Sequence, residues 1–170
     1  MYFALFFYLG SLIFIFFLVI LVIEVITLIG FLFSIVAGIS MSIQGVFNTR
    51  LSEKIGTWQT NVFVQGTALI LAFIILIIFK GGDFSNIKQV NKLYLTGGAF
   101  AVIITFTVME GMKIIGITTA VSTILVAQIV AAALIDCFGV FGTNCVRFDI
   151  TKIIGLITMI IGIIIFKYKG

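Results

Sequence analysis

Long apolar runs separated by short polar gaps dominate this chain. The runs consist mainly of Phe, Leu, Ile and Val, and the charged residues stand almost entirely in the gaps. About 20 apolar residues in a helix cross a hydrocarbon core of about 30 Å, and only helices and closed barrels satisfy every backbone polar group there. The pattern therefore predicts an all-α protein, a polytopic transmembrane helical bundle.

The runs divide into six predicted spans: 3–23, 26–47, 59–79, 93–112, 115–135 and 152–167. The break between the first two spans is weak, because only Glu24, Thr27 and Gly30 interrupt the apolar sequence. A single long helix, bent or partly interfacial, is the alternative for this region. We expect residues 1–25 to form an accessory N-terminal hydrophobic span, followed by a five-helix membrane domain over residues 26–170.

Composition agrees with a membrane protein and removes several kinds of chemistry. The chain is 62% hydrophobic and 9% charged, so it lacks the polar surface of a soluble domain. It contains no histidine, the commonest general base and metal ligand, and Cys137 and Cys145 have no other zinc or redox ligands around them. We therefore expect two free thiols, no metal, no cofactor and no enzymatic activity.

The formal charge of +4 reflects basic residues beside membrane spans rather than a nucleic-acid surface. Counted over alternate gaps, the ten positive charges divide into Arg50, Lys54, Lys113, Lys167 and Lys169 against Lys80, Lys88, Lys92, Arg147 and Lys152. Because the two sides are equal, the positive-inside rule gives no orientation. The chain can insert both ways and form an antiparallel dimer, or take its orientation from a partner or from its first span.

Small residues recur at helical spacing in two of the predicted spans. Gly38 and Gly45 lie on one helical stripe, and Gly155 and Gly162 lie on another. In lipid, helices associate through close packing rather than through the hydrophobic effect, and small residues let their backbones approach. We predict that these four glycines are helix-packing positions, with the lining of a path across the membrane as a secondary role.

Amide side chains at membrane depth form a second group of candidates. Gln44 and Asn48 are four residues apart and share a helix face, and Gln128 lies inside the fifth predicted span. Amide groups away from water must find partners, so they either join helices or line a hydrated cavity. Both interpretations stay open for Gln44 and Gln128, and Gln65 ranks below them.

Two acidic residues near the ends of predicted spans are the charged candidates. Glu110 and Lys113 are three residues apart and can pair on one helix face near the membrane surface. Asp136 stands eight residues after Gln128, about two helical turns along the same face. A solvated interfacial ion pair and a helix terminus are the plain interpretations. Attraction of protons or cations is the functional one, since ionisable residues at membrane depth are functional candidates.

Short motifs with polar residues stand in four places along the chain: Gly38 to Leu51 with its Gln-x-x-x-Asn element, Phe63 to Thr67, Gln128, and Ile135 to Gly142 with its Ile-Asp-x-Phe-Gly element. Together they resemble the YdcZ family, short bacterial inner-membrane proteins of the drug/metabolite transporter superfamily. The resemblance covers about residues 30–168. It implies a half-size transporter subunit that pairs with a second copy of itself or with a sister chain.

From the residues and this resemblance we expect a multi-pass protein of the bacterial plasma membrane that exports a small molecule by alternating access. Gln44, Asn48 and Gln128 would line the substrate site, and Glu110 and Asp136 would serve ion coupling or entrance at its two mouths. Proton coupling is a hypothesis that rests on these acids. The alternative is a scaffold or accessory subunit that transports nothing. The expected partners are the lipid bilayer, a small-molecule substrate and a homodimer or sister subunit, with no nucleic acid.

Overall fold

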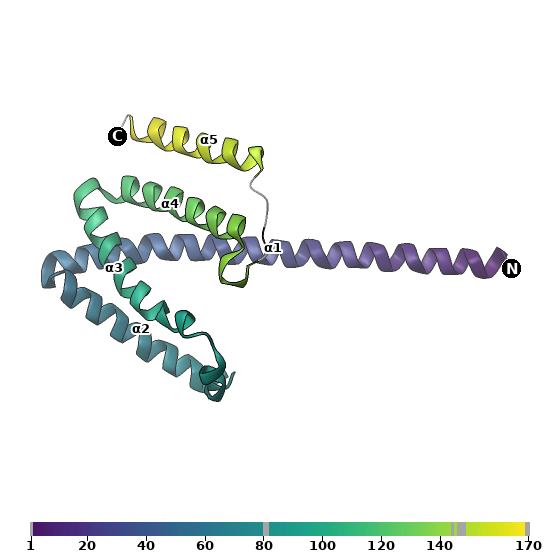
Figure 1. The fold of residues 1–170 in the computed structure, drawn as a ribbon, viewed down its shortest axis with the longest axis horizontal. Helices are drawn as coiled ribbons and strands as arrows, with labels where there is room; N and C mark the ends of the chain where they lie inside the picture. Colours follow the sequence, from purple (N-terminus) through teal and green to yellow (C-terminus); the bar gives the residue numbers. More distant parts are fainter. Residues whose placement is uncertain (1, 80–81, 144, 146–148, 169–170) are drawn as a thin grey trace. The chain divides into compact units, whose positions relative to one another are not determined.

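The computed structural model describes the backbone of residues 2–79, 82–143, 145 and 149–168, shown in Figure 1. Every regular element in this part of the chain is helical, which confirms the all-α class. The elements are α1 (Tyr2–Ile55), α2 (Thr57–Phe79), η1 (Phe84–Gln89), η2 (Lys92–Thr96), α3 (Gly97–Ile115), α4 (Ile117–Phe138), η3 (Val140–Gly142) and α5 (Ile150–Lys167).

The chain divides into two compact units, Met1–Ile43 and Gln44–Gly170. The first unit is helical throughout its described residues, so the turn predicted near Glu24 is not formed. The segment has no proline to interrupt the helix, and Thr27 satisfies its hydroxyl inside the helix by donating to the Ile23 carbonyl, 2.8 Å away. Of the two alternatives for this segment, the structure shows the single long helix. The accessory role of residues 1–25 stays a prediction.

The predicted polar gap at residues 48–58 is also mostly helical. Helix α1 runs to Ile55 and α2 begins at Thr57, so Gly56 alone forms the turn. Hydropathy placed the gap too wide because polar residues such as Asn48 and Ser52 belong to the last turns of α1 and are buried there. Similarly, only Gly116 separates α3 from α4. Residues 113–114, which were predicted to connect the fourth and fifth spans, are instead part of α3.

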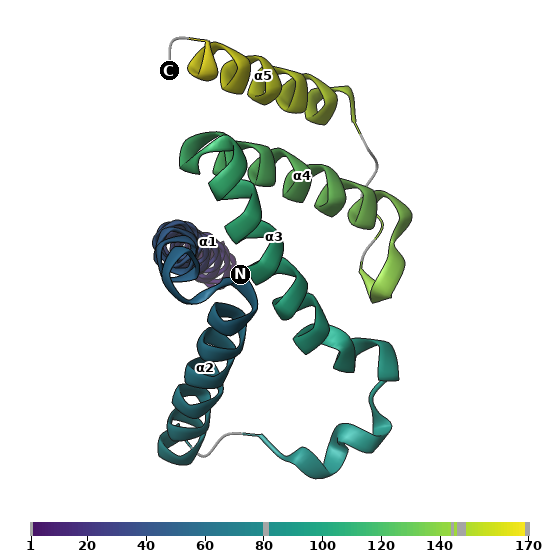
Figure 2. The same ribbon diagram turned by 90° about the vertical axis from the view of Figure 1, so that its left-hand side faces the viewer.

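In the second unit, α3 contacts α2, α4 contacts α3, and α5 contacts α4. Figure 2 shows these four helices following one another in chain order. The closest packing surrounds the C-terminal half of α3, where Met109 is fully buried and Met112 is 4% exposed. Ala120, in the first turn of α4, is buried beside them. This small core lies at the end of the unit where both single-glycine turns are found.

Most other large side chains of the described helices are exposed, and nearly all of them are apolar. Four helical segments have the length and hydropathy to cross a membrane: Ile15–Ile55, Thr57–Phe79, Lys92–Ile115 and Ile117–Phe138. The shorter Ile150–Phe166 is apolar as well. An outer surface of this kind is stable in lipid and would aggregate in water. The structure therefore agrees with a multi-pass membrane protein.

Candidate functional site

Two single-glycine turns bring the ends of four helices together. Gly56 has φ +94° and Gly116 has φ +80°, conformations that residues with side chains rarely adopt. In both turns the glycine N–H donates to the carbonyl four residues earlier, and its carbonyl accepts from the N–H four residues later, at 3.0–3.1 Å. The backbone thus reverses direction without losing these hydrogen bonds. Because the turn backbone needs no side-chain partners, the polar side chains at the turns can bond to one another.

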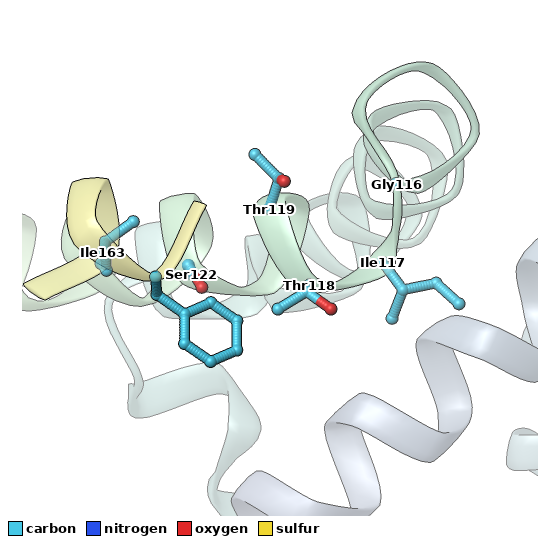
Figure 3. Close-up of a pocket in the computed structure, with 7 residues that line it drawn as sticks. Gly116, Ile117, Thr118, Thr119, Ser122 and Ile163 are labelled. Carbon is cyan, nitrogen blue, oxygen red and sulfur yellow. The ribbon is translucent and has the colours of Figure 1, made fainter. Parts of the chain in front are cut away.

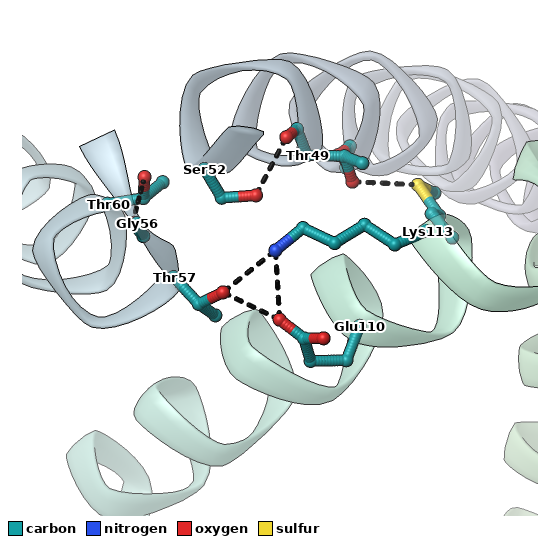
Figure 4. A network of polar contacts seen from close by, with 9 residues as sticks. Thr49, Ser52, Gly56, Thr57, Thr60, Glu110 and Lys113 are labelled. Atoms are coloured by element: carbon teal, nitrogen blue, oxygen red, sulfur yellow. Dashed lines mark hydrogen bonds and ion pairs between the residues drawn. The ribbon is translucent and has the colours of Figure 1, made fainter. Parts of the chain in front are cut away.

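Three polar residues near the two turns bond to one another: Thr57, Glu110 and Lys113. We call this group the Glu110 cluster (Figure 4). The Lys113 Nζ lies 2.9 Å from Glu110 Oε1 and 2.8 Å from Thr57 Oγ1, and the Thr57 hydroxyl donates to Glu110 Oε1 at 2.6 Å. The predicted ion pair between Glu110 and Lys113 is therefore present. Its side chains are 35% and 24% exposed, respectively, so solvent or a ligand can reach them.

Thr57 was missed by sequence reasoning. It begins α2, whereas Glu110 and Lys113 belong to the last turns of α3, and no spacing in the sequence connects the two places. The available signal was its position directly after a glycine in a polar gap. The structure adds that this hydroxyl links α2 to the ion pair of α3.

Buried hydroxyl groups lie next to the Glu110 cluster, as Figure 4 shows. Thr49 donates to the Gly45 carbonyl at 2.7 Å, Ser52 to the Thr49 carbonyl at 2.7 Å, and Thr60 to the Gly56 carbonyl at 2.9 Å. Because each hydroxyl bonds to its own helix or the adjoining turn, it can be buried at small cost. These three buried hydroxyls form a polar layer where α1 ends and α2 begins.

Two amide side chains further along α2 form hydrogen bonds to α3. Asn61 is 2% exposed and donates from Nδ2 to the Val102 carbonyl at 2.9 Å, and Gln65 Nε2 reaches the Thr105 hydroxyl at 3.3 Å. Interhelical bonds of this kind stabilise membrane helices by about 0.6 kcal/mol on average. Gln65 thus joins helices in this structure, while Asn61 was not singled out from the sequence.

The three residues predicted to bind substrate have different environments. Asn48 is 8% exposed on the inner face of α1, while Gln44 and Gln128 are both exposed. In the described part of the chain, none of the three amide side chains takes part in a hydrogen bond with protein atoms. The structure brings Gln44 and Asn48 onto one helix, as their spacing predicted, and shows no contact from either to Gln128. Their role in binding stays a prediction.

Gln44 and Gln128 nevertheless share a depth along their helices. Gln44 stands twelve residues before the Gly56 turn and Gln128 twelve residues after the Gly116 turn. At 1.5 Å per residue, each lies about 18 Å from its turn, close to the middle of a hydrocarbon core of about 30 Å. Both amides are exposed and take part in no hydrogen bond within the described part of the chain.

The four glycines that were predicted as helix-packing positions differ in how closely other atoms approach them. At Gly45 an added Cβ would lie 2.6 Å from the Met112 Cε and 3.2 Å from a Val108 methyl, so α1 and α3 are in close contact there. At Gly38, Gly155 and Gly162 an added Cβ would meet no atom within 4 Å. For Gly155 and Gly162, a packing role requires a neighbour outside the described part of this chain.

Asp136 and Glu110 lie toward opposite ends of α4. Glu110 adjoins the Gly116 turn that begins this helix, and Asp136 is in its last turn, before Gly139 ends it in the left-handed conformation. A helix of 22 residues is about 33 Å long. The two carboxylates therefore lie too far apart to act at one point.

A pocket of about 240 Å³ lies between the start of α4 and the end of α5 (Figure 3). Its lining comprises Gly116, Ile117, Thr118, Thr119, Ser122, Ile163 and Phe166. The hydroxyl groups come from the first turns of α4, and α5 supplies only apolar side chains. Its volume is below the range of about 300–1,000 Å³ that is usual for ligand pockets.

Taken together, these helices define a multi-pass helical membrane protein with a polar junction at its two glycine turns and two exposed amides, each twelve residues from a turn. A family model described as "Putative inner membrane exporter, YdcZ" matches residues 29–165. The match covers most of the chain, which therefore belongs to the YdcZ family and is a multi-pass protein of the inner membrane. The family is one of membrane transporters, which is not a class of enzymes. No curated protein and no solved structure shows significant similarity to the chain.

Proposed function

We propose that this chain is a transporter subunit that exports a small molecule by alternating access. The observation that carries the proposal is a pair of exposed amides, Gln44 and Gln128, that take part in no hydrogen bond within the described part of the chain, and we place them at mid-membrane depth. An amide in contact with lipid alone would lose its hydrogen bonds, at a cost of about 1–3 kcal/mol by mutational estimates. These groups therefore face either a second subunit or a hydrated substrate path.

The proposed transporter consists of two such chains, either two copies or one copy with a sister chain. The polar groups Gln44, Asn48 and Gln128 line the path near its middle, as in transporters whose sites lie near the bilayer midplane. The open glycine stripe of α5, with Gly155 and Gly162, supplies a contact surface between subunits. Glu110 and Asp136 stand at the two mouths and couple export to protons.

Efflux of dansylcadaverine, a fluorescent primary alkylamine, from cells that overproduce the protein tests the transport step. We expect faster efflux than in cells without it, and loss of the gain in Gln128→Ala and Gln44→Ala. The matched control is Gln59→Ala, which removes an exposed amide near the Gly56 turn, away from mid-depth. Equal efflux in all variants would contradict the assigned site. Absence of transport over a wide panel of compounds, with co-purification of an unrelated membrane complex, would favour the scaffold alternative.

The proton-coupling part has its own test. In proteoliposomes that hold an imposed pH gradient, Glu110→Gln and Asp136→Asn should each abolish the dependence of uptake on the gradient, because neither amide can exchange a proton. If both variants keep the dependence of the unaltered protein, coupling through these acids is wrong. The alternating-access proposal would then require another driving ion.

A further inference from the structure

The Glu110 cluster has the geometry of a filled binding site. A primary ammonium has three N–H donors and needs acceptors around it. The ammonium of Lys113 finds two, the Glu110 carboxylate at 2.9 Å and the Thr57 hydroxyl at 2.8 Å, and these acceptors come from different helices. The Thr57 hydroxyl accepts from Lys113 and donates to Glu110, so its orientation is fixed by the group it binds.

The occupant of this site can be exchanged. Lys113 carries its ammonium on a flexible four-carbon stem, and both partners of the ion pair are partly exposed. Three other charged residues lie at this end of α1. Arg50 and Glu53 pair with each other at 3.2 Å and are 68% and 42% exposed, and Lys54 is exposed as well. The first turn of α4 carries no charge. Glu110 is therefore the carboxylate at this junction that a second cation would compete for.

We propose that the Glu110 cluster recognises the primary ammonium group of a substrate, and that Lys113 is its built-in occupant. The incoming amine takes the place of the Lys113 ammonium between Glu110 and Thr57. The substrate class is then a primary amine with an apolar stem. Thr57 selects against quaternary ammonium ions, because these lack the N–H that the hydroxyl accepts. This inference rests on the proposed transport function and adds the substrate class to it.

Chemical rescue of a Lys113→Ala variant tests the site. The purified full-length protein in detergent should lose thermal stability on this substitution. Added n-butylammonium should restore it by mass action, whereas tetramethylammonium should not. The unaltered protein should need at least tenfold more n-butylammonium for an equal rise in melting temperature, because Lys113 competes. Lys54→Ala, which removes a neighbouring exposed cation, is the control and should respond like the unaltered protein.

The double variant Glu110→Gln/Lys113→Ala should show no rescue. The proposal is overturned if this double variant, or tetramethylammonium with the single variant, gives the same rise in melting temperature. These measurements concern binding alone. A failure here therefore leaves the export proposal to the efflux assay, and a failure of efflux leaves the ammonium site standing.

A second measurement needs no unstable variant. Dicyclohexylcarbodiimide activates carboxyl groups, and the activated acid either rearranges to an N-acylurea or is trapped by the added primary amine as an amide. Mass spectrometry of the unaltered protein in its membrane therefore follows the loss of unmodified Glu110, which counts both products. We expect n-butylammonium to slow this reaction and tetramethylammonium to leave it unchanged. In Thr57→Val the difference between the two cations should disappear. Equal protection by both cations, or protection by neither, would overturn the proposal.

Discussion

The two glycine turns of the second unit have the same backbone and different surroundings. Gly56 and Gly116 are sixty residues apart, and the buried residues around them correspond at the same interval: Gly45 with Thr105, Thr49 with Met109, Ser52 with Met112, and Thr60 with Ala120. Around Gly56 the later three side chains are hydroxyls, and around Gly116 they are two methionines and an alanine. One turn is therefore lined with polar groups and the other with apolar ones.

The backbone at these turns forms the helical hairpins, whereas the side chains around them form the candidate site. The hairpin requires a glycine that can adopt a positive φ and the hydrogen bonds on either side of it, which both turns have. The chemistry comes from the side chains, and it arises where the polar turn touches the ion pair beside the apolar turn. The Glu110 cluster is this point of contact, because Thr57 follows Gly56 and Lys113 precedes Gly116.

Replacing the turn glycines by alanine should have the largest effect. Residues held in such conformations cost about 1–3 kcal/mol each when a Cβ is present, so Gly56→Ala and Gly116→Ala should each lower the free energy of unfolding by that amount. At Gly116 the cost is purely that of the backbone, because an added Cβ would meet no atom within 4 Å. Reversible unfolding in mixed detergent micelles measures both.

Gly66→Ala in the middle of α2 is the matched control for the turn variants. It also has open space around an added Cβ, but its φ is negative in a regular helix. Alanine favours helix over glycine by about 1 kcal/mol, so this variant should be neutral or stabilising. Equal losses at Gly66 and Gly116 would contradict the role of the positive φ.

Two hydroxyls that follow the Gly56 turn, those of Thr57 and Thr60, have different partners and can be removed one at a time. Thr57→Val deletes two hydrogen bonds to α3 and should cost about 1 kcal/mol, within the range measured for interhelical bonds in membranes. Thr60→Val deletes only a bond to the Gly56 carbonyl, which already accepts from the Thr60 N–H, and should cost less. The same unfolding assay compares them. A larger loss in Thr60→Val would show that the Glu110 cluster adds little to stability.

The amide between α2 and α3 should have a smaller effect. Asn61→Leu removes the bond to the Val102 carbonyl, and we expect a loss of about 0.6 kcal/mol. The carbonyl is not left without a partner, because it lies within α3 and its second lone pair serves the helix. Gln59→Leu, at an exposed position of α2, provides the baseline. A loss above about 2 kcal/mol at Asn61 would mean that this bond outweighs the glycine turns.

The smallest effect is a pH dependence at the opposite end of α2. Asp83 caps η1 and accepts hydrogen bonds from the Ser85 hydroxyl and N–H, and these bonds lower the pKa of its carboxyl below 3.8. Because the folded-state pKa is depressed, the stabilisation is complete above the unfolded pKa and disappears as the pH falls through the folded pKa. Asp83→Asn should therefore differ slightly from the unaltered protein at pH 6 and match it more closely once the pH has fallen through the folded-state pKa of Asp83. Thermal unfolding at pH 6 and at acidic pH measures the difference, and an opposite trend would refute this assignment.

Sequence reasoning was accurate where one helix contains the whole pattern. Hydropathy identified the apolar helices, and the three-residue spacing of Glu110 and Lys113 predicted their ion pair. It was wrong about the turn near Glu24 and about the width of the gap at residues 48–58. In both places polar residues were interpreted as interruptions, although a helix accommodates them when their hydroxyls bond to its own carbonyls, as Thr27 and Ser52 do.

The sequence by itself determined the membrane as solvent, the helical class, the family and the residues that carry charge and amide groups. All of these follow from composition and local spacing. Only the tertiary structure decided that Thr57 completes the Glu110 cluster, that Asn61 and Gln65 join α2 to α3, and that Gln44 and Gln128 stay exposed. These contacts join residues about 40 or more positions apart, and they depend on the direction that Gly56 and Gly116 give to the helices.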